Sequence, residues 1–125
     1  MSKLTENSVL PSAFAAAGEL QMVGFGLYTL LLDFQSGLHL VVYRLCKVRE
    51  VNGRVRDWDA QTSIARDDPR IVTVLLGRDL ESARIEGPDE MVLHFSDGRE
   101  LILVVDPDEL ESFLIVFPSS VNLVF

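Results

Sequence analysis

Two fifteen-residue segments of the chain, 26–40 and 87–101, share a pattern that constrains the fold more than any other feature. They are offset by 61 residues and agree at five of fifteen positions. The identical pairs are Gly26 and Gly87, Leu32 and Leu93, Phe34 and Phe95, Gly37 and Gly98, and Leu40 and Leu101. Because apolar matches continue for two further residues, we interpret 26–42 and 87–103 as an internal repeat.

Each copy has the pattern of a β-hairpin with a three-residue loop. Both loops, 35–37 and 96–98, end in glycine, as a type I turn followed by a left-handed residue favours. The loop sets the register, so we expect Leu32 to pair with Leu40 and Leu93 with Leu101. Alternation then gives each hairpin one apolar face, and the two faces should pack together as the core.

The predicted fold is mainly β, with an α+β arrangement as the alternative. The chain has 125 residues, 48% of them hydrophobic, which fits a single domain spanning residues 1–125. We expect the hairpins to form a small sandwich or barrel-like antiparallel sheet, with one short N-terminal helix over Ser12 to Leu20. Further strands are expected at 48–51 and 54–58 around Asn52-Gly53, at 71–76, 84–86, 113–117 and 121–125, with a helical turn at 106–111.

The charge of the chain is unevenly distributed. Residues 1–56 carry six basic and four acidic side chains, whereas residues 57–125 carry five basic and fifteen acidic ones. The net charge of −8 disfavours nucleic-acid and membrane-surface partners and permits a basic protein partner, although acidity can also simply keep a small domain soluble. Pro11 and Ser12 break the candidate apolar core of a secretory signal, and Glu19 and Gln21 interrupt the apolar stretch 13–32, which argues against a membrane span. With a single cysteine, Cys46, these features predict a cytoplasmic protein.

Both hairpins place a histidine opposite a carboxylate, Asp33 with His39 and Glu100 with His94. Such a pair can act as a general base, but it is also an ordinary solvated cross-strand pair. No nucleophile or metal-ligand spacing accompanies either histidine. We therefore predict no catalytic residue, no metal, no cofactor and no enzymatic activity, and we expect loss of Glu100 to cost little stability.

Partner-binding residues are predicted at two places. Asp57-Trp58-Asp59 contains the sole tryptophan, which could anchor a protein partner or, alternatively, fill the core. The second place is acidic and could capture a basic protein, or could simply be a solvated surface. Its members are Asp106, Asp108, Glu109 and Glu111.

A basic cluster surrounds Glu50 in the preceding part of the chain. It could form an anion site, or it could keep a sheet edge from pairing with another edge. Its members are Arg44, Lys47, Arg49, Arg54 and Arg56.

The segment Leu76-Gly77-Arg78-Asp79-Leu80-Glu81-Ser82-Ala83-Arg84-Ile85, followed by Val92 to Leu101, resembles small β-rich bacterial proteins found among immunity proteins of toxin–immunity pairs. The resemblance covers about a quarter of the chain and assigns no functional residue. It implies a non-enzymatic cytoplasmic protein that binds a partner.

Three functions remain open at this point. The first is a protein-binding module, an inhibitor or immunity-type protein that captures a basic partner. The second is a small β-barrel or sandwich that holds a small apolar ligand. The third is a self-associating structural protein whose last segment, Val121 to Phe125, pairs with another copy to form a homo-oligomer.

Overall fold

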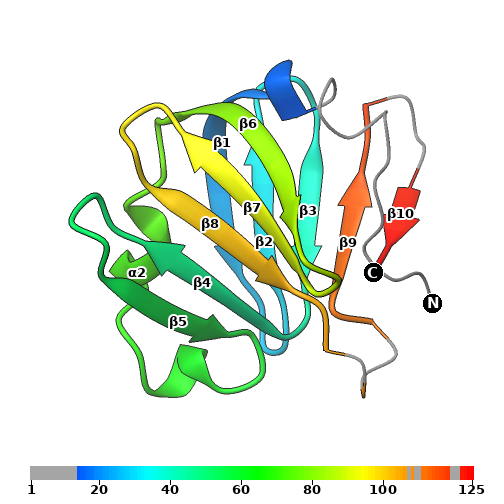
Figure 1. The fold of residues 1–125 in the computed structure, drawn as a ribbon. Coiled ribbons are helices and arrows are strands. Elements are labelled where there is room, and N and C mark those ends of the chain that lie inside the picture. Colours follow the sequence, from blue (N-terminus) through cyan, green and yellow to red (C-terminus); the bar gives the residue numbers. More distant parts are fainter. Residues whose placement is uncertain (1–13, 107, 109–110, 119–121) are drawn as a thin grey trace.

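The computed structural model describes residues 14–106, 108, 111–118 and 122–125. In this part of the chain ten antiparallel strands form one sheet, in the order β10-β9-β3-β2-β1-β6-β7-β8-β4-β5 (Figure 1). The strands are β1 (Gly18–Phe25), β2 (Leu30–Phe34), β3 (His39–Val42), β4 (Leu45–Arg49), β5 (Val55–Asp59), β6 (Asp79–Glu86), β7 (Glu90–Phe95), β8 (Glu100–Val104), β9 (Phe113–Val116) and β10 (Asn122–Val124). A 3-10 turn, η1 (Ser63–Ala65), and a short helix, α2 (Arg70–Thr73), lie between β5 and β6. The prediction of a mainly β fold is confirmed.

The strand order has the same form when it is followed outward from its centre in either direction. From β1 it runs through β2 and β3 to the hairpin β9–β10, and from β6 through β7 and β8 to the hairpin β4–β5. Each terminal hairpin is exchanged between the halves, since β4 follows β3 but pairs with β8, and β9 follows β8 but pairs with β3. The edge strands β10 and β5 do not pair with each other, so the described sheet is not closed.

The registers predicted for the two hairpins are confirmed. Leu32 pairs with Leu40 in β2–β3, and Leu93 pairs with Leu101 in β7–β8. Both hairpins also place a histidine opposite a carboxylate, as expected.

Three hairpin loops share one geometry. Gly37, Gly98 and Gly53 have φ angles of 94°, 93° and 90°, in the left-handed region that favours glycine. In the Asn52-Gly53 loop the backbone N–H of Glu50 donates to the carbonyl of Arg54 at 2.7 Å. This bond extends the β4–β5 ladder by one pair beyond the strands.

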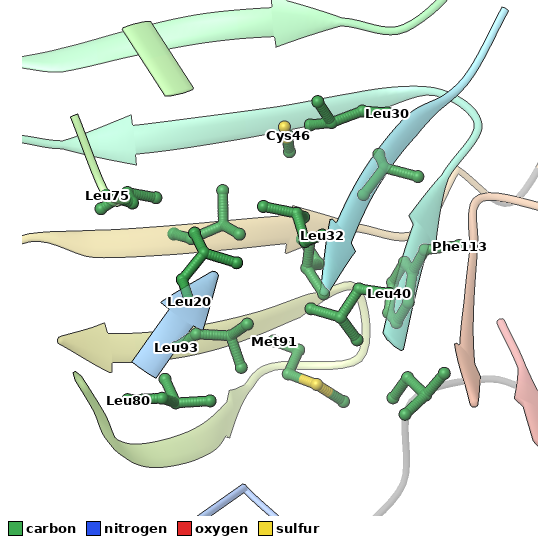
Figure 2. Packing of buried hydrophobic residues seen from close by; sticks show 14 of the residues in the cluster. Leu20, Leu30, Leu32, Leu40, Cys46, Leu75, Leu80, Met91, Leu93 and Phe113 are labelled. Carbon is green, nitrogen blue, oxygen red and sulfur yellow. The ribbon is translucent and has the colours of Figure 1, made fainter. Parts of the chain in front are cut away.

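The sheet folds over on itself, so that β6, β7 and β8 lie in front of β1 and β2 (Figure 1). The inward faces of the layers enclose one hydrophobic cluster, in which leucines from β1, β2 and β7 lie close together (Figure 2). Phe34 of β2 and Phe95 of β7 stack across the layers with ring centroids 6.3 Å apart. The two hairpin faces therefore form the core together, as predicted.

The N-terminal helix ends earlier than the predicted Leu20. Ser12 lies outside the described residues, Phe14 and Ala15 are helical, and β1 already begins at Gly18. Gly18 has a φ of 75°, a common conformation where a helix ends. Leu20 is fully buried and pairs with Phe34 of β2, so packing against the hairpin stabilises the extended conformation.

The prediction of a strand at 71–76 is wrong, because α2 begins this segment. The Asp68 carboxylate accepts the backbone N–H of Arg70 at 2.9 Å and caps the first turn after Pro69. Ile71, Val72 and Leu75 are buried, a helical spacing that packs them against the core. Local capping and burial override the β preference of the branched side chains.

Candidate functional site

Trp58 belongs to the core rather than to the protein surface. Its side chain is 1% exposed, and its ring lies 5.0 Å from that of Phe25, centroid to centroid. Asp57 and Asp59 alternate with it on β5 and therefore point to the opposite, outer face. The prediction that Trp58 anchors a partner is not supported, whereas its two acidic neighbours remain accessible.

The outer face of β6-β7-β8-β4-β5 is rich in charged side chains, and we call it the charged face. Strand alternation and the observed registers define which side chains point outward. They are Ser82, Arg84, Glu86, Glu90, Val92, His94, Glu100, Ile102, Val104, Leu45, Lys47, Arg49, Val55, Asp57 and Asp59.

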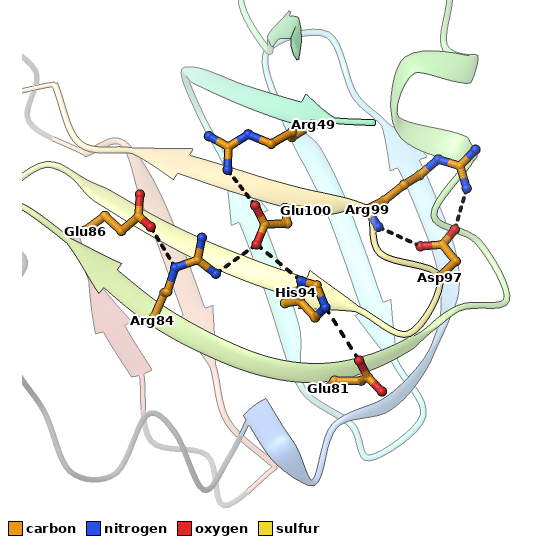
Figure 3. Close-up of polar contacts among 8 residues, drawn as sticks. All are labelled: Arg49, Glu81, Arg84, Glu86, His94, Asp97, Arg99 and Glu100. Carbon is orange, nitrogen blue, oxygen red and sulfur yellow. Dashed lines mark hydrogen bonds and ion pairs between the residues drawn. The ribbon is translucent and has the colours of Figure 1, made fainter. Parts of the chain in front are cut away.

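Glu100 lies at the centre of a polar network on the charged face (Figure 3). Arg49 of β4 donates to its Oε1 at 2.6 Å, and Arg84 of β6 donates to its Oε2 at 2.8 Å. His94 Nδ1 lies 3.3 Å from the same Oε2, and His94 Nε2 lies 3.7 Å from Glu81 Oε1. Four strands thus contribute to one connected set of side chains.

Glu100 is 8% exposed although it points away from the core. The pKa of Glu100 is lowered from 4.5 to about 2, and the largest cause is the hydrogen bond from Arg84. Burial opposes this shift, whereas hydrogen bonds from His94 and Arg49 add to it. The expectation of a solvated Glu100 is therefore wrong, and its contacts lead us to expect that its loss lowers stability. The sequence showed the His94 pair through the hairpin register, but nothing in it linked Arg49 and Arg84 to this carboxylate.

One end of the charged face is acidic, and we call it the acidic end. Glu90 pairs with Glu86 on one side and with Val104 on the other, and Val105 donates to the carbonyl of Asp89 at 2.8 Å. The chain then continues from β8 into the acidic segment predicted to bind a partner. The acidic end comprises Asp59, Glu86, Asp89, Glu90, Asp106 and Asp108.

The remaining predicted acidic residues are placed as follows. Asp106 Oδ1 accepts the backbone N–H of Asp108 at 2.9 Å, and most of the helical turn predicted at 106–111 lies outside the described residues. Glu111 is exposed, and its charge contributes to a raised pKa of Tyr43, for which burial is the larger cause. Glu109 lies outside the described residues.

The outer face of the other half, β1-β2-β3-β9-β10, is largely apolar, and we call it the apolar face. Its outward apolar side chains on β2, β3 and β9 are half-buried, whereas Met22, His39 and Val124 are exposed. Among the described residues of these strands, the charged side chains that point outward are Asp33 and His39, which form an ion pair with each other, and Glu19, which alternates with the buried Leu20 where β1 pairs with β6. The face comprises Met22, Gly24, Leu31, Asp33, His39, Val41, Leu114, Val116 and Val124.

The predicted basic cluster is divided between the two faces of the sheet. Lys47 and Arg49 point outward on β4, whereas Arg54 and Arg56 lie on the inward side, beyond the end of the core. There they line a surface hollow of about 380 Å³, which we call the arginine hollow. It is formed by Glu50, Val51, Asn52, Arg54, Arg56 and Arg99.

We also searched the described part of the chain for a metal site, a reactive thiol and a membrane-spanning helix. No group of three or more His, Cys, Asp or Glu residues is arranged there to hold a metal ion. Cys46 is fully buried, and burial, with smaller effects from Asp57 and Asp59, raises the pKa of its thiol to about 12, so the thiol stays protonated. No helix among the described residues is long and apolar enough to cross a membrane.

No protein-family model matches the chain, and no curated protein or solved structure does. The functional interpretation therefore rests on the surfaces defined above.

Proposed function

We propose that this protein is a non-enzymatic binding module that captures a basic protein partner, as an inhibitor or immunity-type protein does. The observation that carries the proposal is the acidic end of the charged face. It gathers carboxylates from β5, β6 and β7 and from the β8–β9 connection, including three residues predicted from the sequence, Asp59, Asp106 and Asp108.

The carboxylates of the acidic end have two properties that support a role in binding a basic protein. Within the described residues we find no ion pair at Asp89, Glu90 or Asp108, so these carboxylates are available to a partner. The adjoining Glu100 network holds β4, β6, β7 and β8 together through charge-assisted hydrogen bonds. The carboxylates thus stand on an ordered surface, which lowers the entropy that binding must overcome.

Removing charge from the acidic end is expected to slow association. In the double variant Asp89→Asn/Glu90→Gln the on-rate should fall several-fold at low salt and depend less on ionic strength, because long-range attraction acts mainly on encounter. The measurement is surface plasmon resonance at low and at physiological salt, against the protein encoded by the adjacent gene, where an immunity-type protein would have its toxin.

A matched control is Asp67→Asn/Asp79→Asn, which removes the same charge from exposed positions elsewhere. This control should leave the on-rate nearly unchanged. Equal slowing by both double variants would show that net charge, rather than the acidic end, governs association.

Self-association is a second candidate, and the apolar face favours it. A two-fold interface brings the same patch of both copies together, so charged patches of one sign repel each other there. The apolar face carries one carboxylate, Asp33, whose charge is compensated by His39, and Glu19 lies at its border where β1 pairs with β6. Exposed contiguous apolar surface is typical of interaction sites.

Pairing of residues 121–125 with another copy, as predicted from the sequence, cannot be tested cleanly by deleting this segment. Within the chain, β10 already pairs with β9, and Phe125 is 5% exposed and stacks on Phe113 at 5.0 Å. Deleting residues 121–125 would therefore remove part of the core. Val121 lies outside the described residues.

A charge placed in the middle of the apolar face should separate the copies. Val41 lies on β3, the central strand of this face, so Val41→Lys should convert an oligomer into a folded monomer because an unpaired charge at an apolar interface is costly. Sedimentation equilibrium gives the mass, and circular dichroism checks the fold. Val55→Lys, at a 44% exposed site on the charged face, is the control. A wild-type protein that sediments as a monomer would dismiss self-association.

The alternative of a small apolar ligand receives no support from the hollow described here, because five of its six lining residues are polar or charged. We further propose that the two halves of the sheet arose by duplication and form a small sandwich. The equal registers of β2–β3 and β7–β8 support this proposal. A bulge next to Leu20 in β1 and next to Leu80 in β6 supports it as well.

A further inference from the structure

We propose that the arginine hollow binds a small phosphate-bearing molecule or free phosphate. The site is separate from the acidic end, and the proposal does not depend on the capture of a protein partner. It rests on how the strands bring cationic side chains to one place.

Strand pairing at the end of β4 assembles the hollow. Arg49 pairs with Glu100 of β8, so the next residues, Glu50 and Arg99, lie side by side. On the other side, Glu50 pairs with Arg54 through their backbones. Side chains that are directly opposite on adjacent strands share a face, so Glu50 lies between two arginines, with Arg56 one row further along β5.

Arg99 forms a fixed wall of this hollow. Its Nε donates to Glu50 Oε2 at 2.7 Å, and its guanidinium also pairs with Asp97. Burial alone would raise the pKa of Asp97, but hydrogen bonds from Arg99 and the charge of Arg78, whose Nε lies 3.3 Å away, lower it overall. The Glu50 carboxylate is thereby satisfied, which leaves the other guanidiniums available.

Arg54 and Arg56 supply those available groups. Neither guanidinium forms a hydrogen bond or close ion pair within the part of the chain that the structure describes. Arg56 has only a weak effect on Asp68, whose pKa is lowered mainly by hydrogen bonds from Arg70. Two guanidiniums with free donors therefore border the same hollow.

Charge and size indicate the ligand class. With three arginines and one glutamate the lining carries a formal charge of +2, in a chain whose net charge is −8. Guanidinium groups match oxyanions through paired N–H donors, and a phosphate dianion can engage two of them at once. The volume of about 380 Å³ lies at the small end of ligand sites, which favours a small molecule.

The test is a titration of the full-length protein, labelled with ¹⁵N, with sodium phosphate, followed by NMR. We expect saturable shifts at the backbone amides of residues 51–54 and 99, and none with sodium chloride at matched ionic strength. Glycerol 3-phosphate, titrated in parallel, distinguishes the two sources of the group, since tighter binding than inorganic phosphate indicates a phosphomonoester.

The double variant Arg54→Gln/Arg56→Gln should weaken phosphate binding about tenfold or more, because it removes the free donors. Arg66→Gln, an exposed arginine outside the hollow, is the control and should bind as the wild type does. Unchanged spectra away from residues 50–57 and 99 show that the variants remain folded. Arg56→Lys keeps the charge but loses the paired donors, so its affinity should be intermediate.

Three results would overturn the proposal. The first is a set of shifts that phosphate and chloride produce equally. The second is unaltered phosphate affinity in the double variant. The third is tighter binding of a simple carboxylate, such as malonate, than of phosphate.

Discussion

Replacement of Trp58 by alanine should lower the free energy of unfolding by about 3–5 kcal/mol, the range for large aromatic side chains removed from a core. The side chain is 1% exposed on the edge strand β5, and its ring contacts that of Phe25 from the other layer of the sheet. Truncation would leave a cavity between the two layers. Urea denaturation followed by circular dichroism measures the change.

Trp58→Phe is the matched control, because it keeps an aromatic ring next to Phe25. It should recover more than half of the lost stability. A Trp58→Ala protein as stable as the wild type but defective in partner binding would instead place Trp58 in the interface, contrary to its observed burial.

Glu100→Gln should lower the free energy of unfolding by roughly 2–3 kcal/mol at neutral pH, since it leaves two guanidinium groups without their buried counter-charge. Arg49 and Arg84 both bond to this carboxylate, which is 8% exposed. Glu90→Gln, on the same face but outside the network, should change stability by less than about 0.5 kcal/mol. Equal effects of the two substitutions would mean that the network contributes nothing specific.

The same carboxylate predicts how stability depends on pH. The pKa of Glu100 is lowered from 4.5 to about 2 in the folded protein, so folding favours its ionised form. The resulting stabilisation is fully present above pH 4.5 and is lost as the pH falls through about 2. The Glu100→Gln variant should therefore lose less stability than the wild type over that interval, as denaturation curves at a series of pH values would show.

The features that the sequence predicts well are local ones. A glycine at the end of a three-residue loop sets the register of its hairpin, and the register decides which residues face the core. The pairing of Leu32 with Leu40 and of Leu93 with Leu101 follows from that rule, as does the placement of Phe34 and Phe95 on the core face of their hairpins. The contact of His94 with Glu100 follows from it as well.

The features that the sequence does not reveal depend on pairing between distant segments. Glu100 is 51 residues from Arg49 and 16 from Arg84, and only the pairing of β8 with β4 and of β7 with β6 brings the three together. The strand β1 was missed for a similar reason. Its alanine-rich approach favours a helix, and only contact with β2 stabilises the extended form.

The candidate sites divide in the same way. Alternation correctly places Asp57 and Asp59 on the face opposite Trp58, but it cannot tell which face meets solvent when a strand lies at an edge. The basic cluster is contiguous in the chain, yet the register sends its members to different faces and adds Arg99 to the hollow. The closeness of these arginines and Lys47 in the sequence alone would have predicted a single basic site.

The exchange of terminal hairpins between the halves has a consequence for the order of folding. β4 can pair with β8 only after residues 100–103 have been synthesised, and β3 can pair with β9 only after residues 113–116 have been synthesised. During synthesis, β3 and β4 are therefore made well before the strands β9 and β8 with which they pair, so neither half of the sheet can form completely at an early stage. Long loops must be closed before these contacts form, so we expect the chain to fold slowly, as proteins of high contact order do.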